Sequence, residues 1–111
     1  MIITPLDMQK YSQLSILNSK IGFIYNKKND LYRTYREVES LLENEQDEIS
    51  TKRLYDRLAR LTRSMRVLNT QNERVKDEID DLWENYFSPR CIQENVSWAE
   101  MDNELNSMGY P

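Results

Sequence analysis

One stretch, residues 14–42, decides the fold, and it reads LSILNSKIGFIYNKKNDLYRTYREVESLL. Core-type side chains recur in it in alternating steps of three and four residues, which is the heptad spacing of a coiled coil. These side chains are Leu14, Leu17, Ile21, Ile24, Leu31, Tyr35, Val38 and Leu42. The one expected position that is polar is Lys28. The pattern predicts a single long helix with an apolar seam along one side.

A second stretch, residues 54–82, repeats the pattern. Its seam residues are Leu54, Leu58, Leu61, Met65, Leu68, Val75, Ile79 and Leu82, and its single polar break is Asn72. Two matching seams joined by a short polar segment predict a long antiparallel helical hairpin, a coiled coil within one chain. In the register that we favour, Leu14 lies opposite Leu82 and the turn centres on residue 48.

The two polar seam residues fall one layer apart in this register, since Lys28 faces Leu68 and Asn72 faces Ile24. A polar residue at such a position usually fixes the register or the oligomeric state at some expense in stability. We therefore interpret Lys28 and Asn72 as a register-setting polar core, in which Lys28 extends its amine to water and Asn72 bonds to it or to water. The alternative is that this polar spot faces a third chain.

Capping signals define the other boundaries. Thr4 precedes a proline, which predicts a helix start, and Pro89 predicts the end of the second helix. Ser97 begins a capping box for a short third helix that ends near Gly109 and covers the open end of the hairpin. The predicted elements of this all-α single domain (residues 1–111) are a helix over about 5–44, a turn over 45–50, a helix over 51–87, a connector over 88–96 and a helix over 97–107.

Composition narrows the function. The chain of 111 residues carries 15 basic and 19 acidic residues, a formal charge of −4, which argues against general coating of nucleic acid. It has no histidine, the commonest general base and metal ligand, so we expect no enzymatic activity, no metal, no cofactor and no small-molecule substrate. It shows no signal-peptide or membrane-spanning apolar run. We expect a soluble, non-secreted, cytoplasmic protein, or one within a virion or a host cell.

The second helix carries a basic face over residues 53–66. Its arginines are Arg53, Arg57, Arg60, Arg63 and Arg66, and Asp56 is the only acid among them. Arginine favours bidentate contact with phosphate or carboxylate, so this face predicts binding of nucleic acid or of an acidic partner. The alternative is a solvated face that nearby acids of the first helix neutralise.

Aromatic residues flank the seam. Tyr11, Tyr25 and Tyr32 share one heptad position beside the first seam, and Tyr55 and Trp83 take the corresponding side of the second. We call these five residues the aromatic flank. Amphipathic aromatic side chains are enriched at protein interfaces, so we predict that the flank binds a partner. The alternative is that the third helix folds back and covers part of it. A small apolar cluster with Phe87, Ile92 and Trp98 is expected at the open end.

Three hypotheses follow. The first is a non-enzymatic coiled-coil interaction or assembly protein: a homo-oligomer, or a subunit or adaptor of a larger complex of phage or bacterial type. The second is a nucleic-acid-associated accessory protein that uses the basic face over residues 53–66. The third is a small inhibitor that docks on another protein. No motif ties the chain to a family, and its similarity to the hairpins of chaperones, secretion-system stalks and phage assembly factors is architectural.

Overall fold

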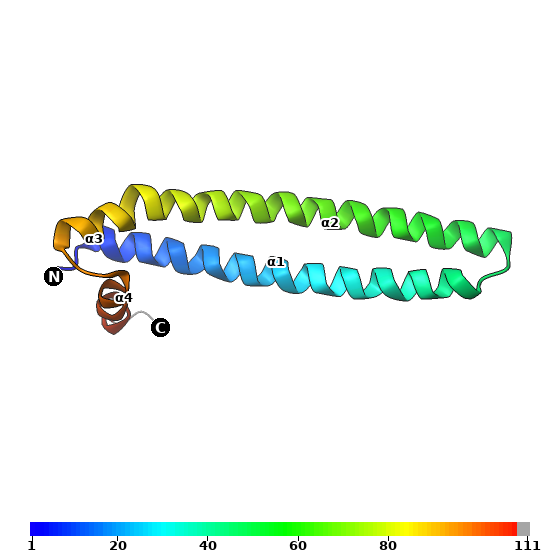
Figure 1. The fold of residues 1–111 in the computed structure, drawn as a ribbon, viewed down its shortest axis with the longest axis horizontal. Helices are drawn as coiled ribbons and strands as arrows, with labels where there is room; N and C mark the ends of the chain where they lie inside the picture. Colours follow the sequence, from blue (N-terminus) through cyan, green and yellow to red (C-terminus); the bar gives the residue numbers. More distant parts are fainter. Residues whose placement is uncertain (109–111) are drawn as a thin grey trace. The chain divides into compact units, whose positions relative to one another are not determined.

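The computed structural model describes residues 1–108, and all of its regular elements in this range are helical. In chain order they are α1 (Pro5–Asn44), α2 (Glu48–Leu82), the π-helical turn η1 (Trp83–Phe87), α3 (Ser88–Glu94) and α4 (Trp98–Ser107) (Figure 1). The two long helices are joined by residues 45–47. The predicted all-α helical hairpin with a short C-terminal helix is therefore confirmed. None of the helices among residues 1–108 combines the length and the apolar character that a membrane-spanning segment needs. Gly109, the predicted stop of the last helix, lies outside the described residues.

The chain groups into two compact units. The end unit comprises Met1–Lys20 and Val75–Pro111, and the turn unit comprises Ile21–Arg74. Each long helix contributes a segment to both units. That the chain behaves as the single domain expected from its sequence stays a prediction.

The seam forms the core of the turn unit. Away from the turn, in residues 21–42 and 54–74, the buried or half-buried residues are the seam positions together with Thr34 and Thr62. Lys28 and Asn72 are both half-buried, as seam residues should be. Their role in setting the register stays a prediction. The heptad pattern thus identifies the packed face of both helices in this unit.

The turn is shorter than predicted, because Asp47 serves as a helix cap. Its side-chain Oδ2 accepts a hydrogen bond from the Ser50 backbone N–H at 2.9 Å, and its carbonyl accepts one from the Thr51 N–H at 2.9 Å. The bond from Ser50 also lowers the pKa of Asp47. α2 therefore begins at Glu48, so the turn predicted over residues 45–50 is wrong in its second half. A loop over residues 45–47 is centred on residue 46, two residues before the predicted centre.

α1 begins as the sequence predicts. The Asp7 backbone N–H donates to Thr4 Oγ1 at 3.1 Å, and the Thr4 N–H donates back to Asp7 Oδ2 at 2.9 Å. The two residues satisfy each other's backbone donors in the manner of a capping box, and Pro5 takes the first helical position, where a missing N–H has no consequence.

The predicted connector over residues 88–96 is wrong for residues 88–94, which form α3. η1 lets the chain pass the proline: the Ser88 N–H bonds to the Trp83 carbonyl five residues back, and Pro89 falls in the first turn of α3, where it is tolerated. α3 ends at Asn95, which adopts the left-handed conformation with φ 52°. The Val96 N–H then bonds to the Cys91 carbonyl at 3.1 Å, as in a Schellman motif.

The core of the end unit lies between α4 and the chain around η1. Phe87, Met101 and Leu105 are buried, and Trp98 stacks edge-on against both Trp83 and Phe87, with ring centroids 4.5 and 5.0 Å apart. Ser97 caps α4 by accepting a hydrogen bond from the Glu100 N–H at 3.2 Å, as predicted. Ile92 was expected in this cluster, but it is exposed. It lies on the solvent side of α3, a helix that the sequence did not predict.

Candidate interaction surfaces

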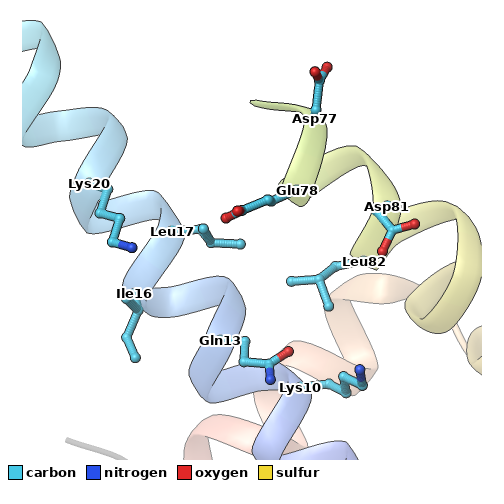
Figure 2. Close-up of a pocket in the computed structure, with 9 residues that line it drawn as sticks. All are labelled: Lys10, Gln13, Ile16, Leu17, Lys20, Asp77, Glu78, Asp81 and Leu82. Carbon is cyan, nitrogen blue, oxygen red and sulfur yellow. The ribbon is translucent and has the colours of Figure 1, made fainter. Parts of the chain in front are cut away.

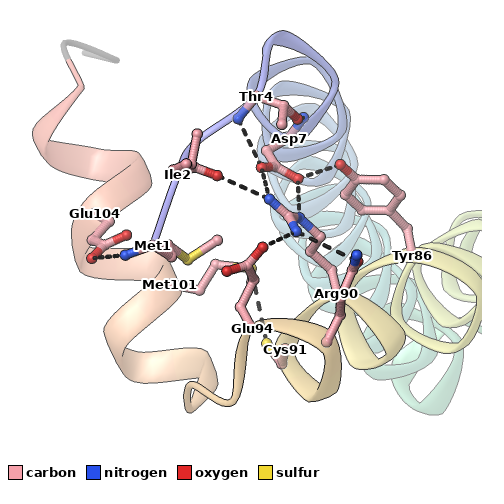
Figure 3. Close-up of polar contacts among 11 residues, drawn as sticks. Met1, Ile2, Thr4, Asp7, Tyr86, Arg90, Cys91, Glu94, Met101 and Glu104 are labelled. Carbon is pink, nitrogen blue, oxygen red and sulfur yellow. Dashed lines mark hydrogen bonds and ion pairs between the residues drawn. The ribbon is translucent and has the colours of Figure 1, made fainter.

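A buried carboxylate organises the polar contacts of the end unit. Asp7 is fully buried, and Figure 3 shows its side chain between those of Arg90 and Tyr86. The Arg90 guanidinium donates to both carboxylate oxygens, with Nε–Oδ1 and Nη2–Oδ2 distances of 3.0 Å. The Tyr86 hydroxyl also donates to Oδ1. Arg90 further donates to the Ile2 carbonyl at 2.9 Å and pairs with Glu94. The arginine therefore ties α3 to the N-terminal segment.

These contacts determine the charge of Asp7. Burial disfavours the carboxylate, but the hydrogen bonds from Arg90, Thr4 and Tyr86 together outweigh burial and hold the Asp7 pKa well below its usual range. Burial and the bond to Asp7 raise the pKa of Tyr86 to about 12. Because the carboxylate is already paired within the chain, we interpret this cluster as stabilising. The sequence analysis predicted no contact between these residues, because Asp7 falls in the helix predicted over residues 5–44 and Arg90 in the connector predicted over residues 88–96.

α4 covers the part of the aromatic flank that lies in the end unit. Tyr11 and Trp83 are half-buried and line one groove together with Trp98 and Asp102 of α4. The Tyr11 hydroxyl donates to Asp102 Oδ1 at 2.7 Å, and burial together with that bond raises the pKa of Tyr11 to about 12. This is the cover that we considered as the alternative to a partner. Tyr11 and Trp83 are engaged within the unit, and their binding to a partner stays a prediction.

The part of the flank in the turn unit is open. Tyr25, Tyr32 and Tyr55 are 65%, 50% and 61% exposed. Tyr32 is oriented by Arg36, whose guanidinium carbon lies 4.6 Å from the ring centroid and whose Nη2 donates to the hydroxyl at 3.2 Å. Of the five candidate partner-binding residues, these three tyrosines are the ones that no other helix of the described structure covers.

The turn unit exposes further large apolar side chains that the sequence analysis did not single out. They are Phe23, Leu41, Ile49 and Val67. A search for apolar residues outside the two seams would have found them, because none occupies a seam position. They extend the apolar exposed surface of this unit beyond its tyrosines.

The basic face divides into two parts. Arg53, Arg57 and Arg60 line a groove of about 570 Å³, which we call the arginine groove, with Leu41 and Leu54 beside them. Glu45 and Asp56 also line it, so it is not uniformly basic. Arg63 and Arg66 are exposed and lie outside this lining. Among residues 1–108, none of the five arginines forms an ion pair within 4.0 Å.

A third groove, which we call the end-unit groove, lies between α1 and α2 and has a volume of about 510 Å³. Figure 2 shows Leu17 and Leu82 pointing into the space between the helices, and Glu78 extending across it toward α1. Lys20 and Glu78 line it together, as the predicted register requires. Its remaining lining residues are Lys10, Gln13, Ile16, Asp77 and Asp81. No groove was predicted here from the sequence.

The fold and these surfaces define a helical-hairpin protein with open aromatic, basic and mixed-charge faces. Comparison of the chain with protein-family models, with curated proteins and with solved structures found no match.

Proposed function

We propose that this protein is a non-enzymatic interaction protein that acts by assembly, either with further copies of itself or as a subunit or adaptor of a larger complex. The observation that carries the proposal is the exposure of Tyr25, Tyr32 and Tyr55, which lie on one side of the helix pair, beside the packed seam. Tyrosine offers a large apolar ring and a hydroxyl that tolerates water, which suits a surface that is wet before binding and buried after it.

The size of the flank supports a role as an anchor within a larger contact. A tyrosine buries about 150–250 Å² when fully covered, so three half-exposed tyrosines can contribute roughly 300 Å². A stable interface buries about 800 Å² on each partner. The three tyrosines alone fall short of such an interface, so other residues of the turn unit have to supply the rest of the contact. The proposal therefore predicts a partner that covers more of the turn unit than its tyrosines.

The test compares a flank variant with a matched control. Tyr25→Ser/Tyr32→Ser/Tyr55→Ser removes the flank, and Ile49→Ser/Ile92→Ser removes exposed apolar side chains elsewhere. Sedimentation velocity over a range of concentrations reports self-association, and capture with the tagged protein from its native lysate reports a foreign partner. We expect the flank variant to lose association or capture while its helical circular dichroism is kept, and the control to retain both. Unchanged association and capture in the flank variant would refute the proposal.

A second candidate function is binding of nucleic acid through the arginine groove. It is favoured by the convergence of Arg53, Arg57 and Arg60 on one groove, with no carboxylate within ion-pair distance of them in the part of the chain described. Such guanidinium groups can replace the counterions of a phosphate backbone, which makes binding fall steeply with salt.

A titration with DNA and with RNA at two salt concentrations tests this candidate. Support would be binding at low salt that weakens at high salt and is lost in Arg53→Ala/Arg57→Ala/Arg60→Ala but kept in the control Arg33→Ala/Arg36→Ala. Absence of binding at low salt would remove the candidate. The third hypothesis, a docking inhibitor, has no observation of its own and stays a prediction.

A further inference from the structure

The end-unit groove separates charge by helix. The basic side chains that line it, Lys10 and Lys20, belong to α1, and the acidic ones, Asp77, Glu78 and Asp81, belong to α2. Between these two rims lie the apolar side chains of Leu17 and Leu82. A groove with an apolar floor and two rims of opposite charge favours a particular kind of partner. That partner presents acidic side chains to the basic rim and basic side chains to the acidic rim.

The charges of both rims are free to meet a partner. In the described structure, neither lysine lies within 4.0 Å of an acidic oxygen of the opposite rim. The closest engagement of Lys10 is with the Tyr86 ring, whose centroid is 5.8 Å from Nζ. Ile16, on the outer side of the basic rim, is 54% exposed and adds an apolar contact there. The lysines and carboxylates of the two rims are therefore available for ion pairs with a partner.

We infer that the end-unit groove docks a second copy of this chain, related to the first by a two-fold axis that runs along the helices. This inference rests on the proposed role in assembly and names a surface other than the aromatic flank. The axis places α1 of one copy against α2 of the other at the same level, so that each basic rim meets an acidic rim. The apolar floors of the two grooves then face each other at the centre of the contact, and the exposed Ile16 of each copy adds apolar surface beside them.

Other occupants fit less well. A two-fold axis across the helices would bring α1 against α1 and α2 against α2, so that like charges face each other, which opposes association. A basic foreign helix would be repelled by the lysine rim, and an acidic one by the carboxylate rim. Both rims are complemented only by a partner that carries basic side chains on one helix and acidic side chains on another. A second copy of this chain has that charge distribution.

Charge reversal tests the inference. In Lys10→Glu/Lys20→Glu both rims are acidic. In Glu78→Lys/Asp81→Lys the α1 rim stays basic and the α2 rim becomes basic in net charge, with only Asp77 still acidic. Each variant should therefore repel its own copy. We expect the dissociation constant of each homodimer to rise by about 100-fold or more in low salt. The control Asp80→Lys/Glu84→Lys makes the same charge change on exposed residues of the end unit that do not line the groove, and it should dimerise like the wild type.

Mixing the two charge-reversed variants shows whether the loss of dimerisation comes from repulsion between copies or from repulsion within one chain. An equimolar mixture pairs an acidic groove with one that is basic in net charge, so a heterodimer should form although each variant alone is monomeric. Mixing cannot repair repulsion inside either chain. Sedimentation velocity of the two variants and of the mixture, with circular dichroism to verify helicity, gives the readout.

Three results would overturn the inference: a wild-type protein that stays monomeric at high concentration, reversed variants that dimerise as tightly as the wild type, or a mixture that stays monomeric. None of them refutes the proposed function, which depends on the flank variant and on capture of a partner. Conversely, a flank variant that still dimerises through a charge-sensitive contact would support the end-unit groove as the dimer interface. It would argue against the aromatic flank as that interface.

Discussion

Replacement of Arg90 by leucine should destabilise the end unit by leaving a buried charge unpaired. Asp7 has no exposed surface, and the Arg90 side chain that neutralises it is 12% exposed. Removing one partner of a buried ion pair costs about 3–5 kcal/mol, mostly because the remaining charge is left without compensation. Arg90→Leu also removes the hydrogen bond to the Ile2 carbonyl. Since Arg90 keeps some contact with water, we expect a loss of about 3 kcal/mol, at the lower end of this range.

Urea denaturation followed by tryptophan fluorescence measures this loss. Trp83 and Trp98 lie in contact in the end unit, so their fluorescence reports the unit that the substitution affects. With a denaturant dependence of about 1–3 kcal/mol per molar urea, the midpoint should fall by roughly 1–3 M. The control is Asp7→Asn/Arg90→Leu, which lacks the unpaired carboxylate and should be less destabilised than Arg90→Leu alone.

The pH dependence of the free energy of unfolding is the most stringent test of the role assigned to Asp7 and Arg90. In the wild type the Asp7 pKa is below its unfolded value near 3.9, so its contribution is fully present above that pH and is lost as the pH falls toward the folded pKa. Without Arg90, burial is opposed only by the hydrogen bonds from Thr4 and Tyr86, and we expect the Asp7 pKa to rise above the unfolded value. Arg90→Leu should therefore regain stability, relative to the wild type, between pH 7 and about pH 4. An equal deficit at both pH values, or an unmoved midpoint, would refute the reasoning.

Substitutions at four further positions test local features, each by chemical denaturation. Phe87→Ala, at a fully buried ring, should cost about 3–5 kcal/mol and a loss below 1 kcal/mol would contradict the proposed core. Gly22→Ala should stabilise by up to about 1 kcal/mol, because the added Cβ meets nothing within 4 Å, and destabilisation would indicate a close approach that the single chain lacks. Asn95→Ala should cost about 1 kcal/mol while Asn95→Gly is tolerated, since φ is 52°; equal effects would argue against a left-handed cap. Ser97→Ala should cost about 1 kcal/mol, and no loss would mean that the cap of α4 is dispensable.

Much of the hairpin was predictable because a long helix pair repeats one rule many times. Each seam residue has to face the other helix, so the heptad pattern identifies the packed face from residue types alone. The ends of α1 and α4 were predictable for a different reason. Thr4 and Ser97 act on backbone N–H groups only three residues away, and such short-range contacts are visible in the sequence.

The end unit was less predictable because its contacts join residues far apart in the chain. Asp7 and Arg90 are 83 residues apart, and nothing in their local sequence distinguishes them from surface charges. Pro89 was interpreted as a helix stop, whereas the π-helical turn before it places it in the first turn of α3. The error in the connector and the missed ion pair have the same origin, because Arg90 reaches Asp7 from that unpredicted helix.

The two units show what covering the aromatic flank does to the seam beside it. In the end unit, α4 packs on Tyr11 and Trp83, and most seam residues are buried, with Ile79 as the half-buried exception. In the turn unit no helix of the described chain covers the flank, and most seam residues are only half-buried, with Ile24 and Val38 as exceptions. The packing of α4 on Tyr11 and Trp83 is thus a model, within this chain, for how a partner would cover the tyrosines of the turn unit. We expect a partner of the turn unit to be a helix that, like α4, sets an aromatic ring and a hydrogen-bond acceptor against the tyrosines.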